Sequence, residues 1–329
     1  MTQPAAVEPT EFPAITLDDV RRAAANIAPH LSLPTPLVFS PALSEELDAH
    51  VSLKLETATP ISAFKVRGGI HLMTELSEAD RATGVVTASS GNHAQSIAFA
   101  ARLFGVEAEI YMPAEANPDK VASVERLGAK AILAGRNYDE AHLLAEQYAA
   151  EVGMRYIHAV NEPQLVRGVA TAALEVLEDQ QPDTDLVIVP IGGGSGTSGW
   201  IVVRDGLGLD TEIWATQSAQ APAVHDSWKE ARLVERPNET RAEGLATGGA
   251  FGLPFGILQR GLNDFILVDD SAIDQAVLTL LTQTHLLAEP AGAAPVAAAF
   301  DQRERLRGRK IVLVISGANI TQDQLKALL

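Results

Sequence analysis

The sequence contains no cysteine among its 329 residues. That absence excludes disulfide bonds, thiolate nucleophiles and cysteine-ligated metal sites. Basic residues are also scarce, since 25 lysine and arginine residues face 42 aspartate and glutamate residues, and the formal net charge is −17. A chain of that sign repels phosphate backbones and anionic membrane surfaces. We therefore expect neither nucleic acid nor a membrane as a partner.

Long hydrophobic runs are missing as well. The longest apolar stretches, such as residues 186–191, are far shorter than the roughly 20 residues that cross a bilayer. The first thirty residues hold Glu8, Glu11, Asp18 and Asp19 and show no basic segment followed by an apolar one, so we expect no signal peptide. These observations favour a soluble, cytoplasmic protein that acts on small molecules.

What the sequence does contain is a regular alternation of short apolar runs with amphipathic segments. Of its residues 47% are hydrophobic and 20% are charged, which suits a large core and two domains. The runs lack period-2 alternation, as is typical of buried parallel strands, and the rhythm predicts open, mostly parallel α/β sheets. Residues 222–247 are polar and irregular in places, and we expect a surface excursion there. We expect strands at residues 84–88, 107–112, 131–133, 186–190, 212–216 and 310–315, and helices at 92–104, 120–127 and 138–152.

A glycine-rich loop follows one of these strands directly, at residues 192–199. Its backbone N–H groups can converge on an anion at the start of the next helix, whose dipole adds to the attraction. A flexible linker is the alternative, but linkers rarely begin at the end of a buried strand. A dinucleotide site would need an acidic residue at the tip of the next strand, where Gln217 stands, and no P-loop lysine follows the glycines. The loop therefore predicts a phosphate ligand without naming it.

Lys65 is one of only seven lysines and stands among small, aromatic and apolar residues. Burial at a helix start would lower the pKa of such a lysine and make its amine a nucleophile. The alternative is an exposed lysine on a first helical turn.

A second loop, Ser89 to Gln95, also follows a strand and opens a helix. Its hydroxyls and the backbone amides of residues 91–93 can hold a carboxylate at the positive helix end. Helix capping by Ser90 or Asn92 would use the same residue types and remains the alternative.

Five motifs in order resemble the serine/threonine dehydratase (threonine ammonia-lyase) branch of the fold-type-II pyridoxal-phosphate enzymes. The resemblance runs from about residue 56 to residue 319. The motifs are S-x-F-K-x-R-G at residues 62–68, S-S-G-N-H-A-Q at 89–95, the glycine loop, E-P-x-G-A at 289–293 before an expected amphipathic helix, and S-G-x-N at 316–319.

The resemblance implies a role for each motif residue. Lys65 would bind pyridoxal phosphate covalently and act as the base at the substrate Cα, and Ser90 matches the opposite-face base of the racemases in this branch. Phe64 would flank the cofactor ring, Asn92 would bond its phenolic oxygen, and Ser316 would face the pyridine nitrogen. The phosphate would lie on Gly192, Gly193, Gly194, Ser195 and Gly196, Glu289 would complete the cofactor site, and Ser89, Ser90, Gly91, Asn92 and His93 would bind the substrate.

The implied fold has two α/β domains with the cofactor in the cleft between them. We expect a small domain at residues 83–153, a large domain at 1–82 plus 154–329, and a homodimer. The implied reaction is β-elimination from L-threonine, with L-serine as a secondary substrate, to a 2-oxo acid and ammonia. Because the chain ends ten residues beyond Asn319, we expect no regulatory domain, which favours a catabolic role. The alternatives are a serine racemase, a 3-hydroxyaspartate dehydratase and a non-enzymatic phosphate-binding module.

Two details refine this interpretation. Some relatives bind a divalent cation through an acidic residue at the position of Gln217, so we predict no metal there. Residues 243–251 combine glycines with an aromatic residue and resemble a substrate-side stretch of threonine dehydratases, although a turn-rich surface loop would have the same composition.

Overall fold

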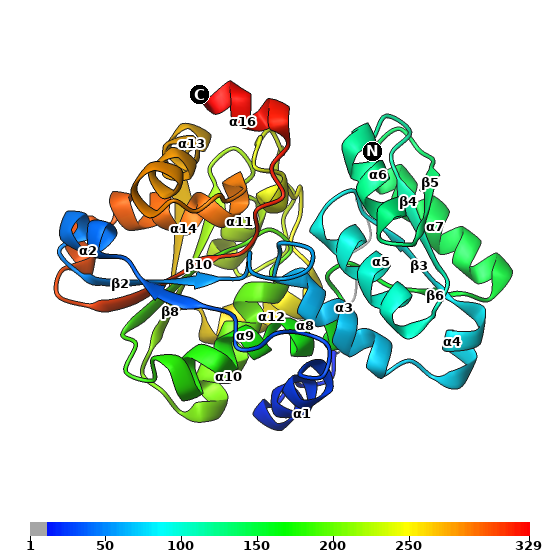
Figure 1. Ribbon diagram of the computed structural model, residues 1–329, viewed down its shortest axis with the longest axis horizontal. Coiled ribbons are helices and arrows are strands. Elements are labelled where there is room, and N and C mark those ends of the chain that lie inside the picture. Colours follow the sequence, from blue (N-terminus) through cyan, green and yellow to red (C-terminus); the bar gives the residue numbers. More distant parts are fainter. Residues whose placement is uncertain (1–11) are drawn as a thin grey trace.

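The computed structural model describes residues 12–329, which form two α/β domains side by side (Figure 1). Residues 1–11, which hold two of the acidic residues behind the signal-peptide expectation, lie outside the described part. One domain contains a six-stranded sheet and the other a four-stranded sheet. Two mostly parallel α/β domains are therefore confirmed.

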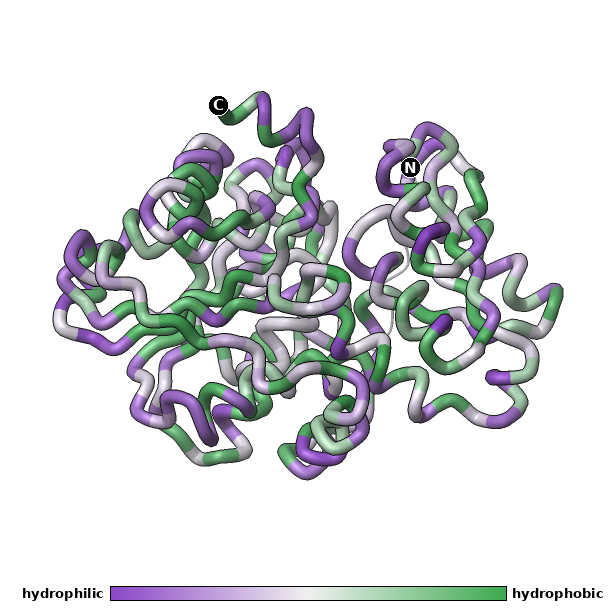
Figure 2. The backbone as a smooth tube through the Cα atoms, viewed as in Figure 1, coloured by the Kyte–Doolittle hydropathy of each residue, from purple (hydrophilic) through white to green (hydrophobic). Residues whose placement is uncertain are grey.

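The large sheet is parallel except at one edge, where its first strand pairs antiparallel with the second. Its central strands are buried over most of their length, which explains why they read as continuous apolar runs. Figure 2 shows this hydrophobic character along the strands at the centre of the domain. In spatial order the strands are β1 (Leu37–Phe39), β2 (His50–Leu55), β10 (Lys310–Ile315), β7 (Leu186–Pro190), β8 (Glu212–Ser218) and β9 (Asp264–Val268).

The small sheet is parallel throughout. The strand β6 of this sheet lies just beyond residue 153, where we expect the small domain to end. We therefore propose that the small domain spans residues 83–156 and that the rest of the chain forms the large domain. In spatial order the strands are β5 (Lys130–Leu133), β4 (Ala108–Met112), β3 (Val85–Ala88) and β6 (Arg155–Tyr156).

Helices pack around both sheets, and α3 lies between the two domains (Figure 1). The α-helices are α1 (Leu17–Ile27), α2 (Pro41–Leu47), α3 (Lys65–Thr74), α4 (Glu78–Thr83), α5 (Asn92–Phe104), α6 (Pro118–Arg126), α7 (Tyr138–Val152), α8 (Pro163–Val169), α9 (Thr171–Leu174), α10 (Ser195–Leu207), α11 (Ala223–Glu230), α12 (Gly252–Gly261), α13 (Asp270–Thr279), α14 (Pro290–Asp301), α15 (Arg303–Leu306) and α16 (Gln322–Leu328). The chain also forms a 3₁₀ turn, η2 (Glu243–Leu245), and two π-helical turns, η1 (Glu175–Gln180) and η3 (Leu280–Thr284).

One expectation about local structure is wrong. Helix α14 is not amphipathic, because residues 291–299 are all buried against the large sheet and α13. Its alanine-rich sequence allows this close packing on every side. Residues 222–247 are irregular only in places, as expected, since they also contain α11, whose Ala223, Val224 and Ser227 are buried.

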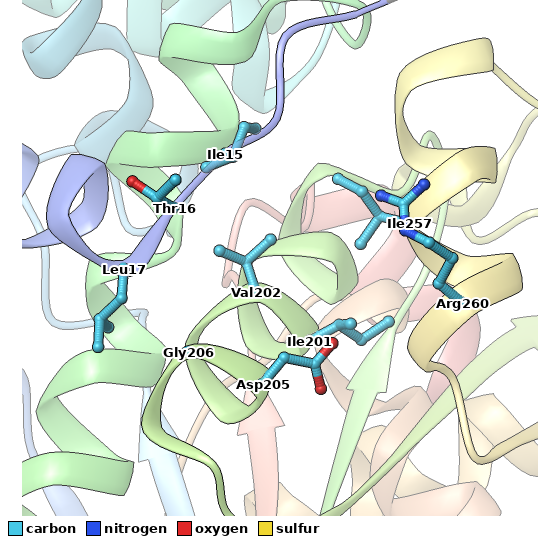
Figure 3. A pocket seen from close by; sticks show the side chains of 9 residues that line it. All are labelled: Ile15, Thr16, Leu17, Ile201, Val202, Asp205, Gly206, Ile257 and Arg260. Atoms are coloured by element: carbon cyan, nitrogen blue, oxygen red, sulfur yellow. The ribbon is translucent and has the colours of Figure 1, made fainter.

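Two further features concern the surface. No helix among residues 12–329 is long and apolar enough to cross a bilayer. A cavity of about 370 Å³ opens between the segment before α1, helix α10 and helix α12 (Figure 3). Its lining includes Leu17, Val202 and Arg260 but none of the predicted site residues, so this cavity is separate from the candidate active site.

Candidate active site

The predicted site residues lie where strands end and helices begin, as ligand sites in parallel sheets do. Lys65 opens α3, residues 89–91 join β3 to α5, and the glycine loop joins β7 to α10. Ser316 follows β10, and its carbonyl accepts a hydrogen bond of 3.0 Å from the Phe64 N–H. That bond connects two motifs that are about 250 residues apart in sequence.

The Lys65 side chain turns inward and is half-buried. Its Nζ donates to Ser195 Oγ at 3.0 Å and lies 5.3 Å from the centre of the Phe64 ring. Burial lowers the pKa of Lys65 from 10.5 to about 8. These contacts favour the nucleophilic interpretation over a lysine exposed on a helical turn.

The glycine loop is built so closely that side chains would not fit. A Cβ atom at Gly192 would lie 2.3 Å from the Gly244 carbonyl oxygen, and one at Gly193 would lie 2.4 Å from Val160 Cγ2. Gly194 has φ of 103°, which L-residues with side chains rarely adopt. The loop is thus a fixed turn into α10 and not a flexible linker.

This turn leaves several hydrogen-bonding groups for a ligand. Within residues 12–329, the N–H groups of residues 192–197 have no protein acceptor, whereas the Ser198 N–H donates to the Gly194 carbonyl. The hydroxyls of Thr197 and Ser198 are buried and also lack a partner in the described chain. Such a set at a helix start suits an anion.

The loop after β3 is not organised as a side-chain helix cap. Helix α5 has Gly91 as its N-cap and no capping side-chain hydrogen bond, so capping by Ser90 or Asn92 is wrong. Ser89 Oγ instead accepts from the Gly91 N–H at 3.2 Å, and Ser90 is half-buried beside it. This leaves the positive end of α5 free for a carboxylate.

His93 is held as a neutral ring with a defined tautomer. Its Nε2 lies 2.9 Å from Thr87 Oγ1, and that hydroxyl donates its single hydrogen to the Ile157 carbonyl at 2.8 Å. Nε2 therefore carries the ring proton. Burial, followed by the charge of Lys65, lowers the pKa of His93 well below 6.5. The buried Nδ1 has no partner among the described residues.

Asn92 meets two residues of the large domain. Its Nδ2 donates to Glu289 Oε1 at 2.7 Å, and its Oδ1 accepts from Asn319 Nδ2 at 2.7 Å. Burial raises the pKa of Glu289 to about 7. The structure thus brings Asn92 and Glu289 together as site residues. Asn319 had no predicted role, although it is part of the motif at residues 316–319.

A buried ionic cluster surrounds Arg67 in the first turn of α3, and nothing in the sequence predicted it. Arg67 bonds both oxygens of Glu56, at 2.7 and 2.9 Å, and also reaches Glu175 at 2.7 Å. Lys54 pairs with the same Glu175 at 2.5 Å. Thr35 donates to Glu56 at 2.7 Å. The charges of Arg67 and Lys54 thus balance those of Glu56 and Glu175 within this cluster.

The 3₁₀ turn η2 lies beside the glycine loop, because the Gly244 carbonyl stands where a side chain of Gly192 would be. Glu243 of this turn pairs with Lys120 of the small domain and accepts from Gln324 of α16 at 3.3 Å. The first residues of the 243–251 stretch therefore connect the glycine loop to both domains. Lys120 was missed, since nothing near it in sequence suggests a partner in the other domain.

Gln217, the residue at which we predict no metal, is fully buried near the end of β8. Its Oε1 accepts from the His225 N–H at 3.2 Å. We predict that magnesium or calcium added after EDTA treatment leaves activity within about twofold, because the amide oxygen of Gln217 carries no charge and already accepts from the backbone, whereas tight sites for either cation include carboxylates. Steady-state assays across a cation titration check this. Activation several-fold above the EDTA-treated level would contradict it.

The chain is similar to known proteins over most of its length. A family model described as "Pyridoxal-phosphate dependent enzyme" matches residues 30–317. An L-threonine ammonia-lyase of Thermotoga maritima is 34% identical over 96% of this chain and 78% of its own length. An L-threonine ammonia-lyase of Geobacter sulfurreducens is 37% identical over 87% of this chain and 71% of its own length.

A solved structure of maize serine racemase superposes with a TM-score of 0.89 at 30% identity, covering 95% of this chain and 97% of the racemase. The family match spans most of the chain and includes every predicted site residue up to Ser316. The chain therefore belongs to the pyridoxal-phosphate dependent enzymes of fold type II.

Proposed function

We propose that this protein binds pyridoxal phosphate and removes the hydroxyl and amino groups of a small hydroxy-amino acid, L-threonine before L-serine, to give a 2-oxo acid and ammonia. The observation that carries the proposal is the Lys65 amine, which has a lowered pKa and lies 3.0 Å from Ser195 at the glycine loop. The similarity to two L-threonine ammonia-lyases supports threonine as the substrate.

The residues present fit this cofactor. Its phosphate matches the unpartnered N–H groups of residues 192–197 and the partnerless hydroxyls of Thr197 and Ser198. Its aldehyde would react with the Lys65 amine, because a lysine of lowered pKa offers the neutral nucleophile. Ser316, which is mostly buried, would hold the pyridine nitrogen.

When bound, pyridoxal phosphate supplies an electron-withdrawing ring that stabilises negative charge at the substrate Cα. Lys65 Nζ would serve as the general base that takes up the substrate Cα proton. The loop from Ser89 to His93 binds the substrate carboxylate at the N-terminus of α5. These groups fix the amino acid so that its Cα–H faces the lysine.

Ser316 gives the site its reaction preference. A hydroxyl does not enforce protonation of the pyridine nitrogen as a carboxylate would, so electron withdrawal stays mild. A milder electron sink favours loss of the β-hydroxyl over transamination. The serine at this position therefore supports elimination as the main reaction.

Racemisation of serine is the second candidate. The similarity to maize serine racemase at 30% identity favours it, and Ser90 lies on the loop after β3 where it would serve as the base on the opposite face. A racemase would convert L-serine to D-serine faster than to pyruvate. Dehydration of 3-hydroxyaspartate is a third possibility, but it would require a further cation near the cleft for the second carboxylate.

A substrate panel tests the proposed reaction. We expect 2-oxo acid and ammonia from L-threonine and from L-serine, with threonine preferred up to about 200-fold, since one methyl group supplies only 1–3 kcal/mol of discrimination. Chiral analysis of the remaining serine measures racemisation in the same reaction. Faster release of D-serine than of pyruvate would show that the main reaction is racemisation and not elimination. Turnover of 3-hydroxyaspartate alone would show that the substrate is neither threonine nor serine.

Cofactor uptake should depend on pH through Lys65. Burial holds the pKa of Lys65 near 8, so the neutral amine predominates above pH 8 and falls to about one tenth at pH 7. The rate at which cofactor-free protein takes up pyridoxal phosphate should therefore rise about tenfold from pH 6 to 7 and level off above pH 8. Stopped-flow absorbance measures it. A rate still rising tenfold per pH unit at pH 9 would mean that the lysine is not shifted.

Two wider features belong to the same proposal. We propose that the protein acts in the cytoplasm as a homodimer in amino-acid catabolism, which its similarity to the L-threonine ammonia-lyases supports. Sedimentation velocity gives the oligomeric state directly, with a single 34.8 kDa species arguing against the dimer.

A further inference from the structure

Asn92 is a point at which the small domain meets the large domain through polar groups, of which Glu289 is buried and the two asparagines are half-buried. It begins α5, whereas Glu289 precedes α14 and Asn319 follows β10. Both partners are therefore contributed by the large domain, from two separate segments. Their distances to the Asn92 carboxamide are equal, at 2.7 Å.

The hydrogen bonds fix the orientation of both carboxamides. Asn319 Nδ2 donates one hydrogen to the Ile61 carbonyl at 2.8 Å and the other to Asn92 Oδ1, so all its donors are used. Asn92 Nδ2 must then face Glu289, and a flipped amide would lose both contacts. One N–H of Asn92 remains without a partner among the described residues.

We propose that Glu289 and Asn319 are positioning residues that clamp the Asn92 carboxamide between the two domains and so aim its remaining N–H at the bound cofactor. The inference rests on the proposed function, because it assumes a cofactor whose phenolic oxygen accepts from Asn92. Neither partner needs to touch the substrate. Each acts by denying Asn92 its other rotamers and its flipped orientation.

The space around Glu289 supports a tight clamp. A Cβ atom at Gly317 would lie 2.4 Å from Glu289 Oε1 and 3.3 Å from Asn92 Nδ2, so only glycine allows the carboxyl to reach the amide. The Glu289 N–H is itself tied to the Gly317 carbonyl at 3.0 Å. That bond fixes the backbone of Glu289 beside Gly317, next to the contact with Asn92.

The clamp should weaken as Glu289 takes up a proton. Burial raises its pKa to about 7, opposed by the Asn92 hydrogen bond, and the neighbouring charges of Glu243 and Lys120 raise and lower it respectively. Above pH 7 the Asn92 N–H donates to a carboxylate, and below it to a neutral acid, which is a weaker acceptor. The visible absorbance band of the lysine-linked cofactor should therefore change with a midpoint near pH 7.

A double-mutant cycle tests the clamp. Asn92→Ala, Glu289→Ala and Asn319→Ala should each raise the Kd of pyridoxal phosphate about tenfold and shift the absorbance band, since each deprives the cofactor of its one well-oriented hydrogen bond from Asn92. The double variants that contain Asn92→Ala should be no worse than Asn92→Ala alone, because the partners act only through Asn92. Gln283→Ala, which removes an exposed amide bond to Glu46, is the matched control and should change nothing.

Glu289→Gln separates position from charge. Its amide oxygen still accepts from Asn92, so we expect cofactor affinity within about twofold of wild type but no band change near pH 7. Losses in the cycle that simply add would overturn the clamp, as would a normal pH response in Glu289→Gln.

The same double-mutant cycle can be measured on the free energy of unfolding of the cofactor-free protein, which does not require the cofactor. If unfolding shows coupling between Asn92 and Glu289 but wild type has no absorbance band of a lysine-linked cofactor, the contact is supported and the proposed function is refuted. A clear band without coupling in either measurement would keep the proposed function and refute the clamp.

Discussion

Lys65→Ala is expected to lower kcat for threonine deamination by about 10⁴-fold, because the substitution removes both the covalent attachment point and the base at Cα. The amine stands 3.0 Å from Ser195 and beside the Phe64 ring, and its pKa of about 8 makes it reactive near neutral pH. A coupled assay for the 2-oxo acid measures the loss. The visible band of the lysine-linked cofactor should disappear together with activity.

The fold should survive that substitution, because burying the Lys65 ammonium is itself unfavourable. We therefore expect an unchanged circular dichroism spectrum and an unfolding midpoint no lower than that of wild type. Lys130→Ala is a suitable control, since Lys130 is exposed and pairs only with Glu109 of the small domain. Full activity in Lys65→Ala would assign the chemistry to another residue, and loss of activity in Lys130→Ala would show that the assay follows stability.

Much of the fold is legible in the sequence where helix ends carry their own signals. The expected helices at 92–104 and 138–152 have the same bounds as α5 and α7. Helix α7 starts at an Asn137 cap, and both helices end at a glycine in the left-handed region, Gly105 and Gly153. Such caps act locally, so a sequence pattern is enough to place them.

Short strands gave no comparable signal. β1 has three residues and β6 has two, and each is defined by the neighbour with which it pairs. The same limit applies to α14. Its sequence predicts an amphipathic helix, whereas in the structure the sheet and α13 bury residues 291–299 on every side. These features depend on tertiary packing, which a local pattern does not contain.

The site divides in the same way. The sequence motifs supply Lys65, the glycine loop and Asn92, because each is a local run of unusual residues. The partners of those residues are far away along the chain, with Asn319 lying 227 residues from Asn92. A polar residue whose partner is supplied by another segment looks like any other polar residue in one sequence. That is why the ionic cluster around Arg67 and the Lys120–Glu243 pair were found only in the structure.

Arg67→Ala is expected to destabilise the protein by about 3–5 kcal/mol, the usual effect of removing one partner from a buried ion pair. Arg67 is fully buried and holds both oxygens of Glu56, which is fully buried too, as well as Glu175. Without it, Thr35 alone would bond Glu56. Urea unfolding followed by fluorescence measures the change, with Arg307→Ala, at an exposed pair, as the control expected to change little.

Lysine should not replace Arg67, because one ammonium cannot match the two-pronged contact with Glu56. The loss in Arg67→Ala should also depend on pH. Burial tends to raise the pKa of Glu56, and the charge of Arg67 is the largest influence that lowers it. Once the arginine is gone, Glu56 can fold as a neutral acid, so the variant should recover stability relative to wild type as pH falls from 8 to 5.

That pH dependence separates a charge effect from a packing effect. A cavity left by the arginine side chain would cost the same free energy at pH 5 and at pH 8, whereas an unpaired carboxylate costs most where it must stay ionised. Because Arg67 lies in the first turn of α3, two residues after Lys65, loss of the cluster should also displace Lys65 and lower kcat more than it raises KM. A uniform destabilisation with unchanged kcat would show that the cluster holds the domain together without orienting the lysine.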